Sequence, residues 1–152
     1  MLPIRKIFCP TDFSGPSYEA LKVAEEMAMH FSAELILVHV VTPISVDPVY
    51  VDPTSFNLPL FEKERETSAK KAMEKLAKEK LSPTIKKKTM VIQGDAAYQI
   101  VELSSDENAD LIIIATHGLT GWRKVIFGSV TEKVIRLSNC PVLSIRIPSP
   151  II

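Results

Sequence analysis

The chain contains little of what marks a disulfide-linked, metal-bound or membrane-spanning protein. Only two of its 152 residues are cysteines, Cys9 and Cys140, and they are too few and too far apart for a disulfide framework or a zinc site. No stretch approaches the roughly 18 consecutive apolar residues that a transmembrane helix needs. The apolar run in residues 1–10 is short and interrupted by Arg5 and Lys6, so we expect no signal peptide and a cytoplasmic protein.

The chain also lacks an excess of charge of either sign. Its 18 Lys and Arg residues are balanced by 18 Asp and Glu residues. Nucleic acids and anionic membranes are normally bound through a basic excess, so we expect neither as a main partner. The 46% hydrophobic and 24% charged residues are typical of a globular protein, and a chain of this length forms a core without disulfide or metal staples.

Five short runs rich in Ile, Val and Leu predict β-strands at residues 4–9, 35–41, 89–92, 111–115 and 142–147. The second and fourth runs are almost entirely apolar, which is typical of strands covered on both faces in a parallel sheet. Residues 42–59 contain four prolines and several apolar side chains, which predicts a long loop. A lid, a subunit contact and a loop packed on its own domain all remain open for it.

Four helices are expected between these strands. Apolar residues three and four positions apart predict helices over residues 21–31 and 69–81. Asp95 is a candidate N-cap for the third, and Ser129 with Glu132 has capping-box spacing at the start of the fourth. Strands and helices therefore alternate, which predicts one α/β domain over residues 1–152, a doubly wound five-stranded parallel sheet with helices on both faces.

Glycine is scarce as well, with five in the chain, and three of them cluster at Gly118, Gly121 and Gly128 after the fourth predicted strand. Glycine is needed where φ is positive or where a ligand approaches the backbone closely. The helix start that follows attracts anions through its free amides, and Ser129 and Thr131 add two hydroxyl donors. A phosphate site is therefore predicted, although neither a P-loop nor a dinucleotide fingerprint is present. Simple turn and cap roles for these residues remain an alternative.

Four blocks of sequence together resemble the universal stress protein family, in its ATP-binding branch. The blocks are IFCPTDFS at 7–14, VHV at 38–40, IIIATHG at 112–118 with GSVTEKVI at 128–135, and CPVL at 140–143. The resemblance covers almost the whole chain. The family's phosphate motif is G-2x-G-9x-G-[S/T], and Gly118, Gly128 and Ser129 match it. Ala115 stands at the first glycine position, where its methyl group would approach a bound nucleotide.

The resemblance implies the strand order 3-2-1-4-5, which puts a ligand site at the switch point between strands 1 and 4. It implies ATP, AMP or ADP as ligand, with the Val40 backbone at the adenine and Asp12 at the ribose or a Mg²⁺-bound water. No metal site made by side chains alone is expected. Asp12 as the cap of the first helix is the alternative. The implied nucleotide-binding residues are Pro10, Thr11, Asp12, Val40, Ile114, Ala115, His117, Gly118, Gly128, Ser129, Val130 and Thr131.

We expect a stress-response module that binds ATP without strong catalysis, since no catalytic motif accompanies the phosphate site. Asp12, His117 and Ser129 do not predict a hydrolytic triad, because Ser129 is not on a G-x-S-x-G elbow. A slow ATP hydrolase and a nucleotide-free dimeric interaction protein are the alternatives.

A homodimer is predicted through the fifth strand. The third strand is guarded against edge pairing by three lysines at residues 86–88. The fifth strand has Arg146 as its only charge, and the resemblance points to the same edge. The predicted interface residues are Val142, Leu143, Ile145 and Ile147.

Overall fold

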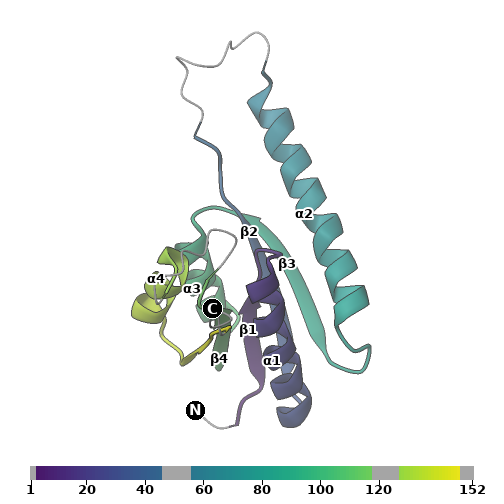
Figure 1. Ribbon diagram of the computed structural model, residues 1–152, viewed down its shortest axis with the longest axis vertical. Coiled ribbons are helices and arrows are strands. Elements are labelled where there is room, and N and C mark those ends of the chain that lie inside the picture. The colour runs from purple at the N-terminus through teal and green to yellow at the C-terminus, as the bar shows by residue number, and fades with distance from the viewer. Residues whose placement is uncertain (1–2, 46–55, 118–126, 148–152) are drawn as a thin grey trace, which may run out of the picture.

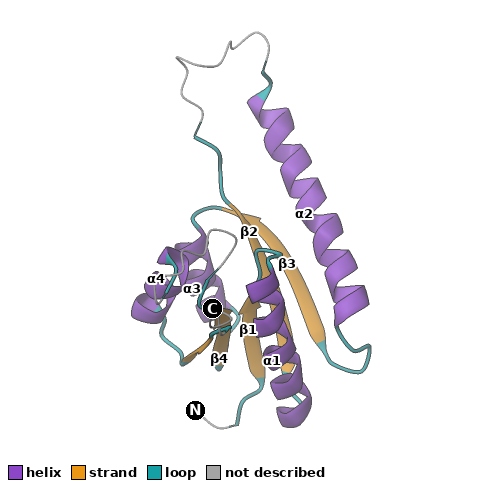
Figure 2. Cartoon of the chain, viewed as in Figure 1, coloured by secondary structure: helices purple, strands orange, loops and turns teal. Residues whose placement is uncertain are grey.

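The sheet at the centre of the molecule is parallel throughout, with the strand order β3-β2-β1-β4-β5 (Figures 1 and 2). The computed structural model describes residues 3–45, 56–117 and 127–147. The strands are β1 Lys6–Pro10, β2 Glu34–Val41, β3 Lys87–Gln93, β4 Leu111–Ala115 and β5 Val142–Ile145. The helices are α1 Gly15–Phe31, α2 Leu58–Lys80, α3 Ala96–Asp106 and α4 Ser129–Leu137. The expected fold and strand order are confirmed.

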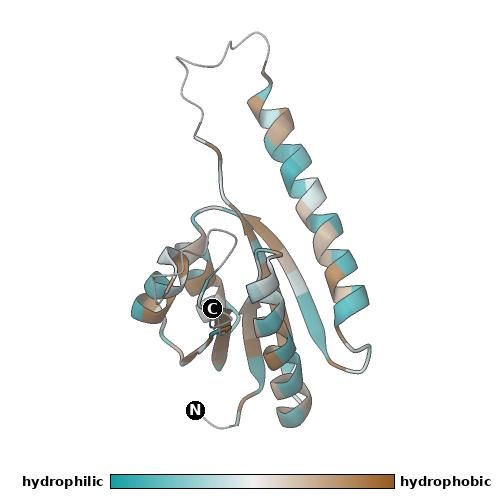
Figure 3. Cartoon of the chain, in the orientation of Figure 1, coloured by the Kyte–Doolittle hydropathy of each residue, from teal (hydrophilic) through white to brown (hydrophobic). Residues whose placement is uncertain are grey.

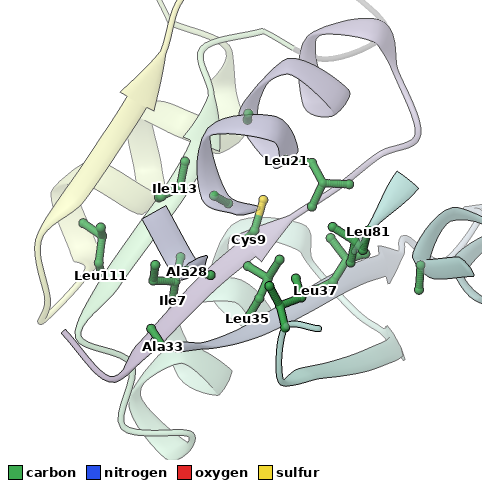
Figure 4. Packing of buried hydrophobic residues seen from close by; sticks show 14 of the residues in the cluster. Ile7, Cys9, Leu21, Ala28, Ala33, Leu35, Leu37, Leu81, Leu111 and Ile113 are labelled. Atoms are coloured by element: carbon green, nitrogen blue, oxygen red, sulfur yellow. The ribbon is translucent and has the colours of Figure 1, made fainter. Parts of the chain in front are cut away.

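Helices cover both faces of the sheet. Under α1 and α2, residues of β1, β2 and β4 form one buried cluster, in which Figure 4 shows Ile7 and Cys9 close to Leu35, Leu37 and Ile113. The opposite side chains of the same strands pack under α3 and α4 in a second cluster. The strands are accordingly mostly hydrophobic, apart from the start of β3 (Figure 3). Burial raises the pKa of the Cys9 thiol to about 12, and both cysteines are free.

Helix α2 begins eleven residues before the predicted position, at Leu58 instead of residue 69. Asn57 caps it, with its Oδ1 accepting from Leu60 N at 3.1 Å, and Pro59 fits in the first turn because no intrahelical amide is needed there. The predicted loop therefore ends too late, and residues 46–55 of it lie outside the described ranges. The first turns of α2 extend past the sheet (Figure 1). They begin with Leu58, Leu60 and Phe61, of which Leu60 and Phe61 are exposed, and continue with six polar residues at 62–67.

The edge strands differ from their predicted bounds by a few residues. At the β3 edge, Lys86 pairs with Glu34 at 3.2 Å and Lys88 with Glu107 at 2.6 Å. At the opposite edge, β5 ends at Ile145, so Ile147 lies beyond the strand.

In the part of the chain that the structure describes, no helix is both long and apolar enough to cross a membrane.

Candidate functional site

A pocket of about 280 Å³ opens at the carboxyl ends of β1, β2 and β4. This is the crevice expected at the switch point, where connections from β1 and β4 leave the sheet in opposite directions. All site residues implied by the sequence resemblance line this pocket, except Gly118, which lies outside the described residues. Five other residues also line the pocket, although the sequence did not predict them as nucleotide-binding residues: Ser17, Val38, His39, Ala96 and Ile100.

One end of the pocket is formed by the first turn of α4. Gly128 is the N-cap and makes no side-chain cap hydrogen bond, and the first intrahelical bond runs from Glu132 N to Gly128 O at 3.0 Å. The amides of Ser129, Val130 and Thr131 therefore have no intrahelical acceptor, and the helix dipole adds positive potential. The predicted capping box is wrong, because Ser129 is the first helical residue and not the cap.

Two hydrogen bonds attach this helix start to the end of β4. Gly128 N donates to Thr116 O at 2.7 Å, and the buried Thr131 hydroxyl donates to Ala115 O at 2.7 Å. The prediction that Thr131 offers a hydroxyl proton to phosphate is therefore wrong, since that proton is directed to a carbonyl. Its backbone amide remains available to a ligand as the third residue of the helix.

Gly128 has an extended backbone, with φ −69° and ψ 160°, so it is not required by a positive φ. An added Cβ would lie 3.4 Å from Thr116 O and 3.9 Å from the His117 Cα, which is ordinary contact. The glycine thus leaves the helix start without a side chain that could cover its amides.

The other end of the pocket is apolar, with side chains from β2, α3 and β4. On β2, Val38 O accepts from Thr11 N on the β1 side, whereas Val41 O accepts from Gly94 N on the β3 side. Because backbone groups alternate between neighbouring strands, the Val40 amide and carbonyl face the β1 side, beyond Pro10 where β1 ends. A flat apolar group entering here would meet hydrocarbon on its faces and peptide groups at its edge.

Asp12 lies between these two ends, in the turn from β1 to α1. Both the backbone amide and the hydroxyl of Ser14 donate to Asp12 Oδ1, the amide at 3.0 Å. The cap of α1 is Ser14, whose Oγ accepts from Ser17 N. The alternative in which Asp12 caps this helix is therefore wrong. Among the described lining residues Asp12 is the only acid, and none is Lys or Arg.

Ala115 and His117 end β4 beside the α4 helix start. The Ala115 methyl group belongs to the buried cluster under α1, and the residue is 7% exposed. The methyl group of Ala115, by which the chain departs from the family motif, thus packs mainly in the hydrophobic core. His117 Nδ1 lies 2.9 Å from the Thr116 hydroxyl. Within the described ranges, no group of three or more His, Cys, Asp or Glu side chains could hold a metal ion.

Residues 3–146 match the model of the Universal stress protein family. The chain belongs to the universal stress protein family. It is 35% identical to universal stress protein MJ0531 of Methanocaldococcus jannaschii, over 95% of this chain and 83% of that protein. It is 33% identical to universal stress protein MJ0577 of the same organism, over 93% of this chain and 94% of that protein.

Solved structures of the family share the fold. The MJ0577 structure superposes with a TM-score of 0.75 at 32% identity and covers 96% of this chain and 98% of its own. A universal stress protein from Archaeoglobus fulgidus, solved in complex with dAMP, has a TM-score of 0.58 at 20% identity. The match covers 95% of this chain and 98% of that chain. At that identity the likeness shows the fold alone.

Proposed function

We propose that this universal stress protein is a cytoplasmic stress-response module of the ATP-binding branch, which signals by nucleotide occupancy and not by rapid catalysis. The observation that carries the proposal is the first turn of α4. Its three amides are left without a side-chain cap at one end of a pocket whose other end is apolar. Free amides with a helix dipole suit phosphates, and an apolar slot bordered by peptide groups suits a purine.

The pocket gives each part of the nucleotide a separate partner. The adenine lies against Val40 and Ile114, and the Val40 peptide groups read its edge. The ribose, or a water bound to Mg²⁺, contacts Asp12, since a single carboxylate is too small a ligand set to hold the ion alone. The phosphates lie over the amides at the start of α4, and the family motif also assigns them Gly118, which is outside the described residues. The relative from Archaeoglobus fulgidus was solved with dAMP, so the fold itself accommodates an adenine nucleotide.

Little catalysis is expected from this arrangement. Phosphoryl transfer needs a positioned nucleophile and strong stabilisation of the developing charge. The described part of the pocket offers backbone donors, one acid and two histidines, with no Lys or Arg. We expect an ATPase rate below about 1 s⁻¹ with saturating Mg²⁺ and ATP. A higher rate would place the protein among the enzymes.

The proposal is tested by calorimetry with ATP, ADP and AMP. Gly128→Val introduces a branched side chain beside the phosphate site and should reduce affinity more than Ser129→Ala. Ser129→Ala removes one hydroxyl, and a hydrogen bond from it to a charged acceptor would be worth at least about tenfold in affinity. Gly15→Val is the matched control, because a Cβ there meets nothing within 4 Å, and it should bind like the parent. A parent protein without measurable affinity would favour the nucleotide-free interaction protein.

We also propose that two copies pair through the β5 edge. Leu143 is 37% exposed and Ile147 is 40% exposed, and Val142 and Ile145 are partly buried. A two-fold contact would remove this apolar surface from water. Leu143→Asp should therefore give a monomer by light scattering at micromolar concentration. Leu60→Asp, on the exposed first turn of α2, should leave the dimer intact, and a monomeric parent would contradict the pairing.

A further inference from the structure

His39 contacts the turn that carries Asp12, although it belongs to a different strand. Its Nδ1 lies 2.8 Å from Thr11 O. A carbonyl oxygen can only accept, so Nδ1 must carry the proton. The imidazole ring also lies against the Phe13 ring, with centroids 4.5 Å apart and planes tilted by 34°. The contacts of His39 thus fall on the residues immediately before and after Asp12.

The turn itself needs such support. Phe13 has φ 62°, in the left-handed region that bulky residues rarely adopt. Its amide donates to the Thr11 hydroxyl at 3.1 Å. If the turn relaxed toward a commoner conformation, the carboxylate of Asp12 would leave its place in the pocket wall.

The opposite side of the turn is fixed from α1. Ser17 Oγ donates to Ser14 O at 2.8 Å, so its 3.0 Å contact with the Thr11 hydroxyl must be donated by Thr11. Thr11 is thereby held by its hydroxyl toward α1 and by its carbonyl toward β2. His39 supplies the second of these attachments.

We propose that His39 is a positioning residue, which holds Asp12 in place for the ribose or the metal-bound water by donating to Thr11 and stacking on Phe13. The role of the carboxylate rests on the proposed nucleotide binding. The geometry of the turn does not, and it can be measured without a ligand.

Two substitutions separate the two contacts. His39→Phe keeps a ring beside Phe13 and removes the donor, whereas His39→Asn keeps an N–H near the Nδ1 position and removes the ring. With ATP as the probe, we expect His39→Phe to weaken binding about three- to tenfold, the range of one net hydrogen bond. His39→Asn should recover part of that loss. His30→Phe, at the exposed end of α1, is the control and should bind like the parent.

A double-mutant cycle with Asp12→Ala decides whether His39 acts through the carboxylate. If it does, His39→Phe should change affinity less than twofold once Asp12 is absent. Equal losses in both backgrounds would overturn the proposal. If His39→Phe does not fold, His39→Leu, which lacks both contacts, takes its place in the cycle and in the comparison with His39→Asn.

Amide hydrogen exchange of the ligand-free protein keeps this inference separate from nucleotide binding. In His39→Phe, the Phe13 and Ser14 amides should exchange at least about threefold faster, while amides within α3 keep the parent rate. Unchanged exchange at Phe13 and Ser14 would overturn the positioning role. Absent ATP binding in the parent would instead overturn the proposed function.

Discussion

Helices α1 and α4 both begin beside the pocket, and they begin in opposite ways. The first turn of α1 is capped by the Ser14 side chain, which also donates to Asp12. The first turn of α4 follows Gly128 and has no side-chain cap. Both helices start at the carboxyl edge of the same sheet, although they cover opposite faces of it. The chain satisfies an amide of α1 with a side chain and leaves the first amides of α4 without a side-chain acceptor, where the proposed nucleotide phosphates would bind.

Helix α3 is a third helix at the pocket, and like α1 it has a side-chain cap. It also starts at the pocket, and Asp95 caps it by accepting from Tyr98 N at 3.1 Å. Leaving α4 with glycine as the cap costs only a few tenths of a kcal/mol compared with a polar cap. An open anion site can therefore be built at this helix start with little loss of stability.

The largest loss of ATP affinity is expected if α4 is given a side-chain cap like that of α3. Gly128→Asp places a carboxylate over the amides of Val130 and Thr131, and the extended backbone at residue 128 accepts a side chain. We expect ATP affinity to fall at least about 100-fold, from blocked donors and like charge, while stability stays the same or rises by a few tenths of a kcal/mol.

Calorimetry and thermal unfolding measure the two effects of Gly128→Asp separately. Gly128→Ala is the control, because it adds the Cβ without the charge and should lose much less affinity. If Gly128→Asp bound ATP like the parent, the phosphates would not lie at α4.

The next largest effect is expected where α4 is attached to β4. Thr131→Val keeps the side-chain shape and removes the hydroxyl that donates to Ala115 O. Leaving a buried carbonyl without this donor should lower the free energy of unfolding by about 1–3 kcal/mol. Ser129→Ala, at an exposed position in the same turn, should change it by less than about 0.5 kcal/mol. Equal stability of the two variants in denaturant unfolding would contradict this difference.

On the other side of the comparison, Ser14→Ala removes the cap of α1. We expect a loss of about 1 kcal/mol in the free energy of unfolding, measured as a lower thermal midpoint. ATP affinity should fall as well, since Ser14 also donates to Asp12. Asp95→Ala removes the cap of α3 and should cost similar stability with a smaller change in affinity. If Asp95→Ala lost more ATP affinity than Ser14→Ala, the idea that Ser14 supports nucleotide binding through Asp12 would be wrong.

The sequence predicted the elements that bury an apolar face and missed those that do not. The five strands were predicted as short apolar runs and the packed half of α2 by its helical period, because burial selects apolar residues. In the first turns of α2, Leu60 and Phe61 are exposed and residues 62–67 are polar, so no apolar period marks them. The Glu66–Lys70 pair adds a little helix stability there. The strand order and the set of site residues came from the family resemblance, whose motifs lie at strand ends.

The finer contacts of the site depend on distances that no local pattern encodes. Ser129 and Glu132 have the right spacing for a capping box, but the helix starts at Ser129 itself, one residue earlier than that motif requires. The Thr131 hydroxyl meets a carbonyl 16 residues away, and His39 meets one 28 residues away. Such pairings follow from how the strands are ordered in the sheet, so they become visible only in three dimensions.

The smallest effect is expected at Ala115, the one departure from the family's phosphate motif. Because its methyl group packs in the cluster under α1, Ala115→Gly should change ATP affinity by no more than about threefold, with any change toward tighter binding. The loss of a buried methyl in a strand should lower the free energy of unfolding by about 0.5–1 kcal/mol. Calorimetry beside thermal unfolding measures both. A gain in affinity of tenfold or more would mean that the methyl group meets the nucleotide, and that β4, as well as the start of α4, limits how closely the phosphates approach the backbone.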